Sequence, residues 1–154
     1  MSILVGPALH PAHLIPDLKS CSRDAVLGEL ARQAQGIGVT REPGMLRAAL
    51  LMREHLGSTA LGHGFAVPNT RSLVVSRPVL LVGRSRPGVD WGGGDEAPVH
   101  VAVLVISPAE MSAAQHVAAV AHVVGATRAA RARQRLFESD RPDEIARWLA
   151  VAPG

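Results

Sequence analysis

The chain has a single cysteine, Cys21, and no apolar run that reaches the ~18 residues needed by a membrane-spanning helix. One cysteine cannot form an internal disulfide, so the sequence is compatible with a reducing cytosol. No His or basic pair stands beside Cys21 with a catalytic spacing, and we therefore expect a buried, structural thiol. Residues 1–9 are apolar but lack a positively charged start, so we expect a soluble, cytoplasmic protein that is not exported.

Lysine and aromatic residues are nearly missing. Lys19 is the one lysine among 16 basic residues, the net charge is only +3, and there are two Phe and no Tyr. Because the basic excess is mild and neither interleaved aromatic residues nor a nucleic-acid motif accompanies it, we do not expect binding to DNA or RNA. The length of 154 residues and the hydrophobic share of 47% suit one domain over residues 1–154, with a core at about 14–149.

Several functional signatures are also missing. The sequence has no serine-nucleophile, P-loop or dinucleotide-binding pattern, and we expect no cofactor. His10 and His13 are three residues apart without an acidic or Cys partner nearby, so a metal site is not expected. The glycines at 92–94 do not predict a phosphate cradle, because no strand leads directly into them and no helix follows at once.

Apolar residues at helical spacing, together with capping residues, predict helices along much of the chain. The first follows the N-cap Ser22 and ends at the glycines 36 and 38, and the second runs from Pro43 to Gly57. A third begins with a capping box at either Ser107 or Ser112, and two more are expected over 127–137 and from 140 onward. In the third helix, His116 lies on the inner edge of a predicted buried stripe: Val117, Val120, Ala121 and Val124.

Strand patterns lie between the helices, at about 14–15, 65–67, 79–82 and 99–106. The last of these is apolar on both faces apart from His100, which is typical of a central strand. Strands and helices that share one apolar core indicate an α/β sandwich.

The most distinctive stretch is a short apolar run held between glycines and a proline, which places Asn69 at the end of a predicted strand. With the residues before it, the sequence is Arg53-Glu54-His55-Leu56-Gly57-Ser58-Thr59-Ala60-Leu61-Gly62-His63-Gly64-Phe65-Ala66-Val67-Pro68-Asn69. This stretch resembles the phosphorylation loop of the IIA components of the bacterial phosphoenolpyruvate-dependent sugar phosphotransferase system, in the fructose, mannitol and nitrogen-regulatory branch. There the pattern is approximately Arg-Glu, a few residues, then Ser-Thr-Gly-x-Gly-x-Gly-x-Ala-Ile-Pro-His. The segment at 88–99 is also similar to the family's Gly-Ile-Asp-Phe segment and the Asp-Gly-x-Pro-Val turn that follows it.

The resemblance implies the family's three-layer fold, a mixed β-sheet flanked by helices on both sides. It also implies site residues: Arg53 and His116 match the arginine and second histidine that surround the family's phosphohistidine, and Ser58 and Thr59 match its small hydroxyl residues. The phospho-acceptor histidine itself matches Asn69, a neutral carboxamide whose nitrogen is a poor nucleophile. The predicted site is therefore Asn69, His116 and Arg53, with four further pocket residues: Ser58, Thr59, His63 and Pro68.

Three functions are compatible with this pattern. The first is a regulatory or binding module that resembles a permanently unphosphorylated IIA protein, with a phosphocarrier protein or a regulated target as partner and a membrane transporter as a further possible partner. The second is an active phosphoryl carrier in sugar uptake that uses His116 or His63 as its acceptor. The third is a sensor of a small anion or metabolite that binds between Arg53 and His116. The sequence leaves open whether the chain has any activity in phosphoryl transfer, and it does not indicate the oligomeric state.

A last feature is an arginine-rich segment near the C-terminus. Arg128, Arg131 and Arg135 follow helical spacing, with Arg133 off to one side. This pattern predicts a solvated helix face, or alternatively a basic face that docks an acidic partner.

Overall fold

The computed structural model describes residues 11–92 and 97–150. Its helices are a short 3-10 turn η1 (Pro11–His13), α1 (Arg23–Gly36), α2 (Pro43–Leu56), α3 (Ala113–Ala126), α4 (Ala130–Glu138) and α5 (Pro142–Ala150). Its strands are β1 (Leu14–Ile15), β2 (Ala60–Gly62), β3 (Phe65–Ala66), β4 (Asn69–Ser72), β5 (Val79–Val89) and β6 (Val99–Pro108). Residues 93–96, which belong to the segment at 88–99 that is similar to the family's pattern, lie outside the described residues.

The strands form one mixed sheet in the order β1-β5-β6-β3-β2, and β4 also pairs with β6. β5 and β6 are antiparallel, whereas β1 is parallel to β5, and both β3 and β4 are parallel to β6. β6 is therefore the central strand, as its two apolar faces predict. Its odd-numbered and even-numbered residues point to opposite faces of the sheet, because side chains alternate along a strand.

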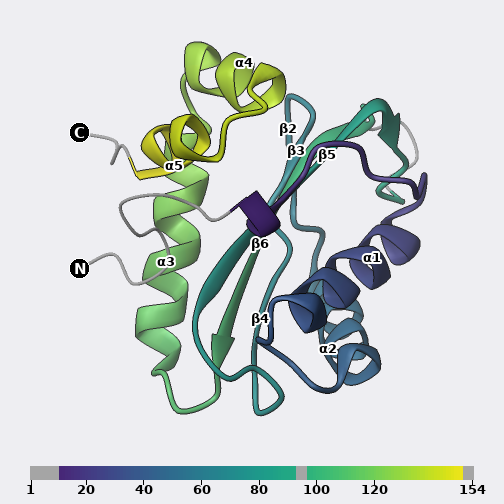
Figure 1. The fold of residues 1–154 in the computed structure, drawn as a ribbon, viewed down its shortest axis with the longest axis vertical. Helices are drawn as coiled ribbons and strands as arrows, with labels where there is room; N and C mark the ends of the chain where they lie inside the picture. The colour runs from purple at the N-terminus through teal and green to yellow at the C-terminus, as the bar shows by residue number, and fades with distance from the viewer. Residues whose placement is uncertain (1–10, 93–96, 151–154) are drawn as a thin grey trace.

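Helices cover both faces of this sheet, and Figure 1 shows α1 and α2 on one side and α3, α4 and α5 on the other. Leu27, Leu30, Leu46 and Leu50 of the first pair pack with the even-numbered residues of β6, such as Leu104. On the other face, Val101, Val103 and Val105 pack with a second set of apolar residues: Val123, Leu136, Ile145 and Leu149. The predicted three-layer α/β sandwich is confirmed.

The helix boundaries follow their capping residues. The Ser22 side chain accepts a hydrogen bond at the start of α1, Pro43 opens α2, and Gly57 caps the end of α2. Of the two predicted starts for α3, Ser112 is the one used, with a complete capping box to Gln115, while Ser107 lies within β6.

Two predictions of local structure were wrong. Cys21 is exposed, because it lies in the extended segment before α1, where its carbonyl accepts a hydrogen bond from the Asp90 amide and its side chain is left in solvent. The strand expected at 65–67 is interrupted before Asn69, which instead begins β4. Pro68 has no N–H to donate to a sheet, although its carbonyl still accepts from the Val105 amide and keeps the chain beside β6.

Candidate active site around Asn69 and His116

The register of β4 against β6 decides which side chains face α3. Asn69 pairs with Val105, and Arg71 pairs with Ser107. Paired residues in a sheet point to the same face, and Val105 belongs to the apolar set under α3. Asn69, Arg71 and Ser107 therefore all point toward the layer that contains α3.

His116 lies on the first turns of α3, directly above these residues. Its Nδ1 is 2.8 Å from Ser107 Oγ, and its Nε2 is 3.1 Å from Asn69 Oδ1. Asn69 and His116 are only 8% and 7% exposed, and Ser107 is fully buried. The three side chains form a buried polar chain that ties α3 to the ends of β4 and β6.

The direction of each hydrogen bond in this chain follows from Asn69. Its Nδ2 donates to the Val67 carbonyl at 3.0 Å, which a carbonyl oxygen could not do, so Oδ1 faces His116. Because that oxygen can only accept, His116 carries its proton on Nε2 and accepts at Nδ1 from the Ser107 hydroxyl. Both imidazole nitrogens and both ends of the Asn69 carboxamide are thus engaged within the protein.

The surroundings of His116 also favour its neutral form. Burial lowers the pKa of His116 below its ordinary value, and the positive charges of Arg71 and Arg53 lower it further. A neutral imidazole with one N–H and one lone pair is what the hydrogen bonds to Asn69 and Ser107 require.

Arg53 comes from the opposite layer, at the C-terminal end of α2. Its Nη1 donates to the Gly57 carbonyl at 2.8 Å, so the side chain folds back over the residue that caps its own helix. α2 and α3 both contact β4, and Arg53 near the end of α2 and His116 near the start of α3 line one cavity beside this strand. The predicted placement of Arg53 close to Asn69 is observed, since both line one cavity.

That cavity has a volume of about 350 Å³ and combines two arginines with an apolar wall. Its lining residues are Arg53, Asn69, His116, Val117, Val120, Ala121, Val124 and Arg128. The four residues of the predicted buried stripe of α3 are therefore the wall of this cavity, and Val117 is 63% exposed. Val120 and Val124 are half-buried and also pack against the core, as expected, whereas Val117 and Ala121 are exposed. The prediction was wrong for the latter two, because helical spacing identifies an apolar face but not what that face meets.

The two small hydroxyl residues have local partners instead of facing the cavity. The Thr59 hydroxyl and amide both donate to the buried carboxylate of Glu54, which also accepts from Trp91 Nε1 at 3.2 Å. Ser58 Oγ accepts from the Ala60 amide. These bonds hold the loop that follows α2 in place. Ser58 and Thr59 therefore support the position of Arg53, although neither is among the residues that line the cavity.

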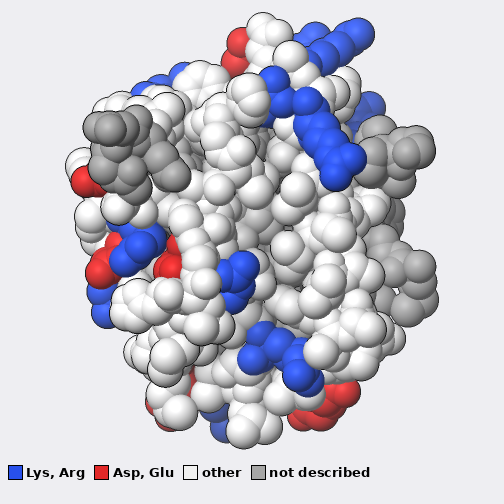
Figure 2. All heavy atoms as spheres, turned by 180° about the vertical axis from the view of Figure 1, so that it is seen from behind, with Lys and Arg blue, Asp and Glu red and all other residues white. Residues whose placement is uncertain are grey.

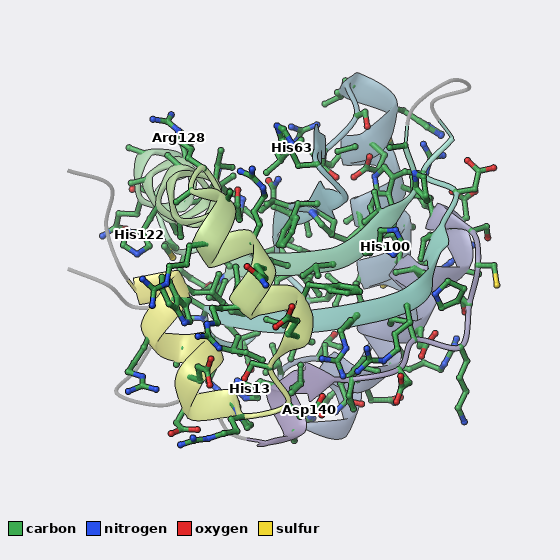
Figure 3. All side chains as sticks on the ribbon, turned by 90° about the horizontal axis from the view of Figure 1, so that it is seen from above. His13, His63, His100, His122, Arg128 and Asp140 are labelled. Carbon is green, nitrogen blue, oxygen red and sulfur yellow. The ribbon has the colours of Figure 1, made fainter. Side chains whose placement is uncertain are left out.

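His63 lies in the turn between β2 and β3, with a φ of 54° between two glycines of positive φ. The side chain is exposed, and Figure 3 shows it at the outline of the molecule, apart from His100. It lines a neighbouring hollow that shares Val124 and Arg128 with the cavity of Asn69. Pro68 is buried and acts through its carbonyl bond to β6.

Sequence reasoning missed three contributors to the site. Ser107 was considered only as a possible helix cap, and its place under His116 follows from strand register, which no local pattern reveals. Arg71 donates from Nη1 to the carbonyls of Ala109 and Met111, both at 2.9 Å, and holds the connection between β6 and α3. Arg128 was assigned to a basic helix face, yet it follows α3 and lines the cavity.

The described residues 11–92 and 97–150 contain no group of three or more His, Cys, Asp and Glu side chains that could hold a metal ion. None of the helices within these ranges is long and apolar enough to cross a membrane. The chemistry available around Asn69 is therefore that of two guanidinium groups, one neutral imidazole and one carboxamide beside an apolar wall.

Comparison with known proteins gives the class to which this fold and site belong. Residues 8–151 match the family model described as "Phosphoenolpyruvate-dependent sugar phosphotransferase system, EIIA 2". The chain belongs to this family, and it is a IIA-type protein of the phosphotransferase system.

Individual relatives come from both the sugar-transport and the nitrogen-regulatory branches. A nitrogen regulatory protein of Bradyrhizobium diazoefficiens is 30% identical over 143 residues, which cover 93% of this chain and 92% of that protein. The fructose-specific EIIABC component of Bacillus subtilis is 27% identical over 129 residues, and the match covers 84% of this chain but only 20% of that longer protein.

Solved structures agree on the fold. The nitrogen regulatory protein IIA-Ntr of Neisseria meningitidis superposes with a TM-score of 0.80 at 24% identity, covering 92% of this chain and 96% of that one. The IIA mannitol protein of Escherichia coli gives a TM-score of 0.76 at 20% identity, covering 92% and 99%. The same IIA has been solved in complex with phosphorylated enzyme IIB of the mannitol system, and that structure gives a TM-score of 0.75 at 19% identity, covering 92% and 96%.

Proposed function

We propose that this IIA-type protein is a regulatory or binding module that does not take phosphate at position 69 and presents the surface of an unphosphorylated IIA protein. The observation that carries the proposal is the state of the Asn69 carboxamide. Its nitrogen donates to the Val67 carbonyl and its oxygen accepts from His116, so the group is held in place. The lone pair of the nitrogen is delocalised into the carbonyl, which makes it a poor nucleophile toward phosphorus.

His116 is a poor substitute acceptor for the same reason. Nε2 carries a proton that it donates to Asn69, and the lone pair of Nδ1 accepts from Ser107. A nucleophilic nitrogen would have to break one of these buried bonds, at a side chain that is 7% exposed. The carrier hypothesis is therefore better supported for the exposed His63 than for His116. Of the two arginines that line the cavity of Asn69, Arg128 also lines the hollow of His63, whereas Arg53 does not.

A partner surface next to the cavity supports the binding role. Met45, Met52 and Leu56 of α2 are 60%, 67% and 83% exposed, and their spacing of seven and four residues places them in one stripe along the helix. Arg53 lies on the same helix, and the exposed Val117 is on the other side of the cavity. We propose that a phosphocarrier protein or a regulated target protein in the cytoplasm docks here.

A second candidate function is the sensing of a small anion. Two arginines and an apolar wall surround a cavity of a size that suits a small ligand, and a carboxylate or phosphate with a short apolar portion would match both. In this case an oxyanion raises the melting temperature, while a carrier protein does not bind.

The decisive experiment is the intact mass of the chain after incubation with phosphoenolpyruvate and the two general carrier proteins of the phosphotransferase system. The native chain, Asn69→His and the matched control Asn69→Gln are compared. We expect one phosphoryl group on Asn69→His and none on the other two.

Each other outcome has a definite meaning. Phosphorylation of the native chain would contradict the proposal, and the modified residue would identify the acceptor among His63, His116 and the remaining histidines. If Asn69→His also stays unmodified although it is folded, docking of the general carriers is absent and the anion-sensing function gains support.

A further inference from the structure

α4 and α5 form a second basic region, separate from the cavity of Asn69. Their facing sides make an open groove of about 460 Å³ that is lined by Arg131, Arg135, Glu144, Arg147 and Trp148. In Figure 2, the largest gathering of Lys and Arg atoms is at the upper right, over the end of the molecule that these helices form.

The three arginines of this groove are exposed and without an acidic partner among the described residues. Ion pairs are recorded for Arg23, Arg84 and Arg141. Arg131, Arg135 and Arg147 form no ion pair within residues 11–92 and 97–150, even though Glu144 lines the same groove. The nearby Glu138 receives its hydrogen bond from Gln134 at 3.1 Å and not from Arg135.

This arrangement opposes the stability of α4. Arg131 and Arg135 are four residues apart, so their like charges lie one above the other on the helix surface. Arg147 brings a third guanidinium from α5. A surface selected for stability alone would place opposite charges at this spacing.

Trp148 adds an apolar element to the groove. The indole is half-buried against the core, and the guanidinium carbon of Arg131 lies 6.0 Å from its ring centre. Arginine and tryptophan are among the residue types enriched at the energetically dominant positions of protein–protein interfaces.

We propose that the α4–α5 groove is a docking site for an acidic segment of a partner protein, distinct from the surface around Asn69. Carboxylates pair with guanidinium groups through two parallel hydrogen bonds, and an apolar side chain of the segment packs on Trp148. Discrete carboxylates suit this groove better than a continuous phosphate surface does, because Glu144 is within it and Glu138, Asp140 and Asp143 are close along the chain. The open shape and exposed arginines suit a protein segment better than a small molecule, which binds in enclosed pockets.

Fluorescence anisotropy with a labelled peptide tests the proposal. The probe is a short peptide in which Glu alternates with Ser around a central Leu, and its control has Gln in place of every Glu. The variant is Arg131→Gln with Arg135→Gln, and the matched control is Arg32→Gln with Arg41→Gln, which removes two exposed arginines from the α1 side of the molecule. Circular dichroism melts of both variants verify that they are folded.

We expect the acidic peptide to bind the native chain and the control variant alike, and to bind the groove variant about tenfold more weakly. The Gln peptide should not bind. The proposal is overturned if the acidic peptide does not bind, if the Gln peptide binds equally, or if both double variants lose affinity to the same extent. It is also overturned if ATP, single-stranded DNA or phosphatidylglycerol vesicles bind in a groove-dependent way while the acidic peptide does not.

Discussion

Two arginine-containing regions of this protein use their polar groups in opposite ways. Around Asn69, the carboxamide, the imidazole and the Ser107 hydroxyl are buried and satisfy one another, and Arg53 is tied to the Gly57 carbonyl. In the α4–α5 groove, three arginines face solvent and have no acidic partner among the described residues. In the first region the polar groups form hydrogen bonds within the protein, whereas in the second region the exposed guanidinium groups remain available to bind another molecule.

Arg84 shows how many hydrogen-bond acceptors accompany a buried arginine in this fold. It is 2% exposed and donates to the carbonyls of Pro16, Phe137 and Ser139 as well as to the Asp140 carboxylate. The guanidinium and its hydrogen bond hold the pKa of the Asp140 carboxyl below its ordinary value. Since the groove arginines have no such set of acceptors, they stay on the surface.

The largest effect expected from this comparison is on stability when the polar chain at the cavity is broken. Asn69→Leu leaves the Val67 carbonyl and His116 Nε2–H without a partner, and each unsatisfied buried group costs about 1–3 kcal/mol. We expect the free energy of unfolding to fall by about 2–4 kcal/mol in urea titrations.

The matched control for this substitution is Gln35→Leu, which makes a similar polarity change at an exposed position of α1. Its effect should stay within about 0.5 kcal/mol. If Asn69→Leu is as stable as this control, the hydrogen bonds around Asn69 are not structural and the comparison between the two regions fails.

A smaller effect is expected from pH. Because the folded-state pKa of His116 is lowered, the unfolded chain takes up the proton first as the pH falls. The stabilising contribution is complete above the ordinary His pKa of about 6.5 and is lost progressively below it, down to the folded-state pKa. The fall in unfolding free energy between about pH 7.5 and pH 5.5 should therefore be steeper for the native chain than for His116→Gln. Equal slopes for the two proteins would mean that His116 is not held neutral.

The smallest effect is expected in the groove. Replacing Arg131 and Arg135 by Gln removes a like-charge pair and the contact of Arg131 with the Trp148 ring, but no hydrogen bond to the described residues. The two effects oppose each other, so the unfolding free energy should change by no more than about 0.5 kcal/mol. Chemical denaturation at low and at high salt measures this, since a charge effect is screened by salt. A loss of more than about 1 kcal/mol would show that these arginines hold α4 in place, and their charge would not be free for a partner.

Most of the fold follows from local patterns in the sequence. The caps Ser22 and Ser112, the first-turn Pro43 and the stop at Gly57 set helix ends where they were expected. The nearly continuous apolar run of β6 identified a central strand buried on both faces. Of the residues that the resemblance assigned to one site, Arg53, Asn69 and His116 line one cavity, whereas the predicted pocket residues Ser58, Thr59, His63 and Pro68 are not part of its lining.

Other features could not be predicted, because they depend on what meets across space. Helical spacing assigned the whole apolar stripe of α3 to the core, but in the structure Val117 and Ala121 are exposed and the stripe lines a cavity, since α2 ends and β4 begins beside it. Ser107 enters the site only through the pairing of β6 with β4. The Cys21 side chain was expected in the core, and only the path of the chain before α1 leaves it in solvent.

By itself, the sequence determined the family, the layered α/β architecture and the presence of a carboxamide at position 69, because these depend on residue identity, spacing and capping. The tertiary structure decided the state of that carboxamide. β4 pairs with β6 and α3 lies above them, so Asn69 and His116 form a hydrogen bond that sets the orientation of the carboxamide and the tautomer of the imidazole. It also decided that Arg131, Arg135 and Arg147 share one groove, since two helices that follow one another along the chain fold back to face each other. Local chemistry is encoded residue by residue, whereas the partners of a polar side chain are set by contacts between segments far apart in the sequence.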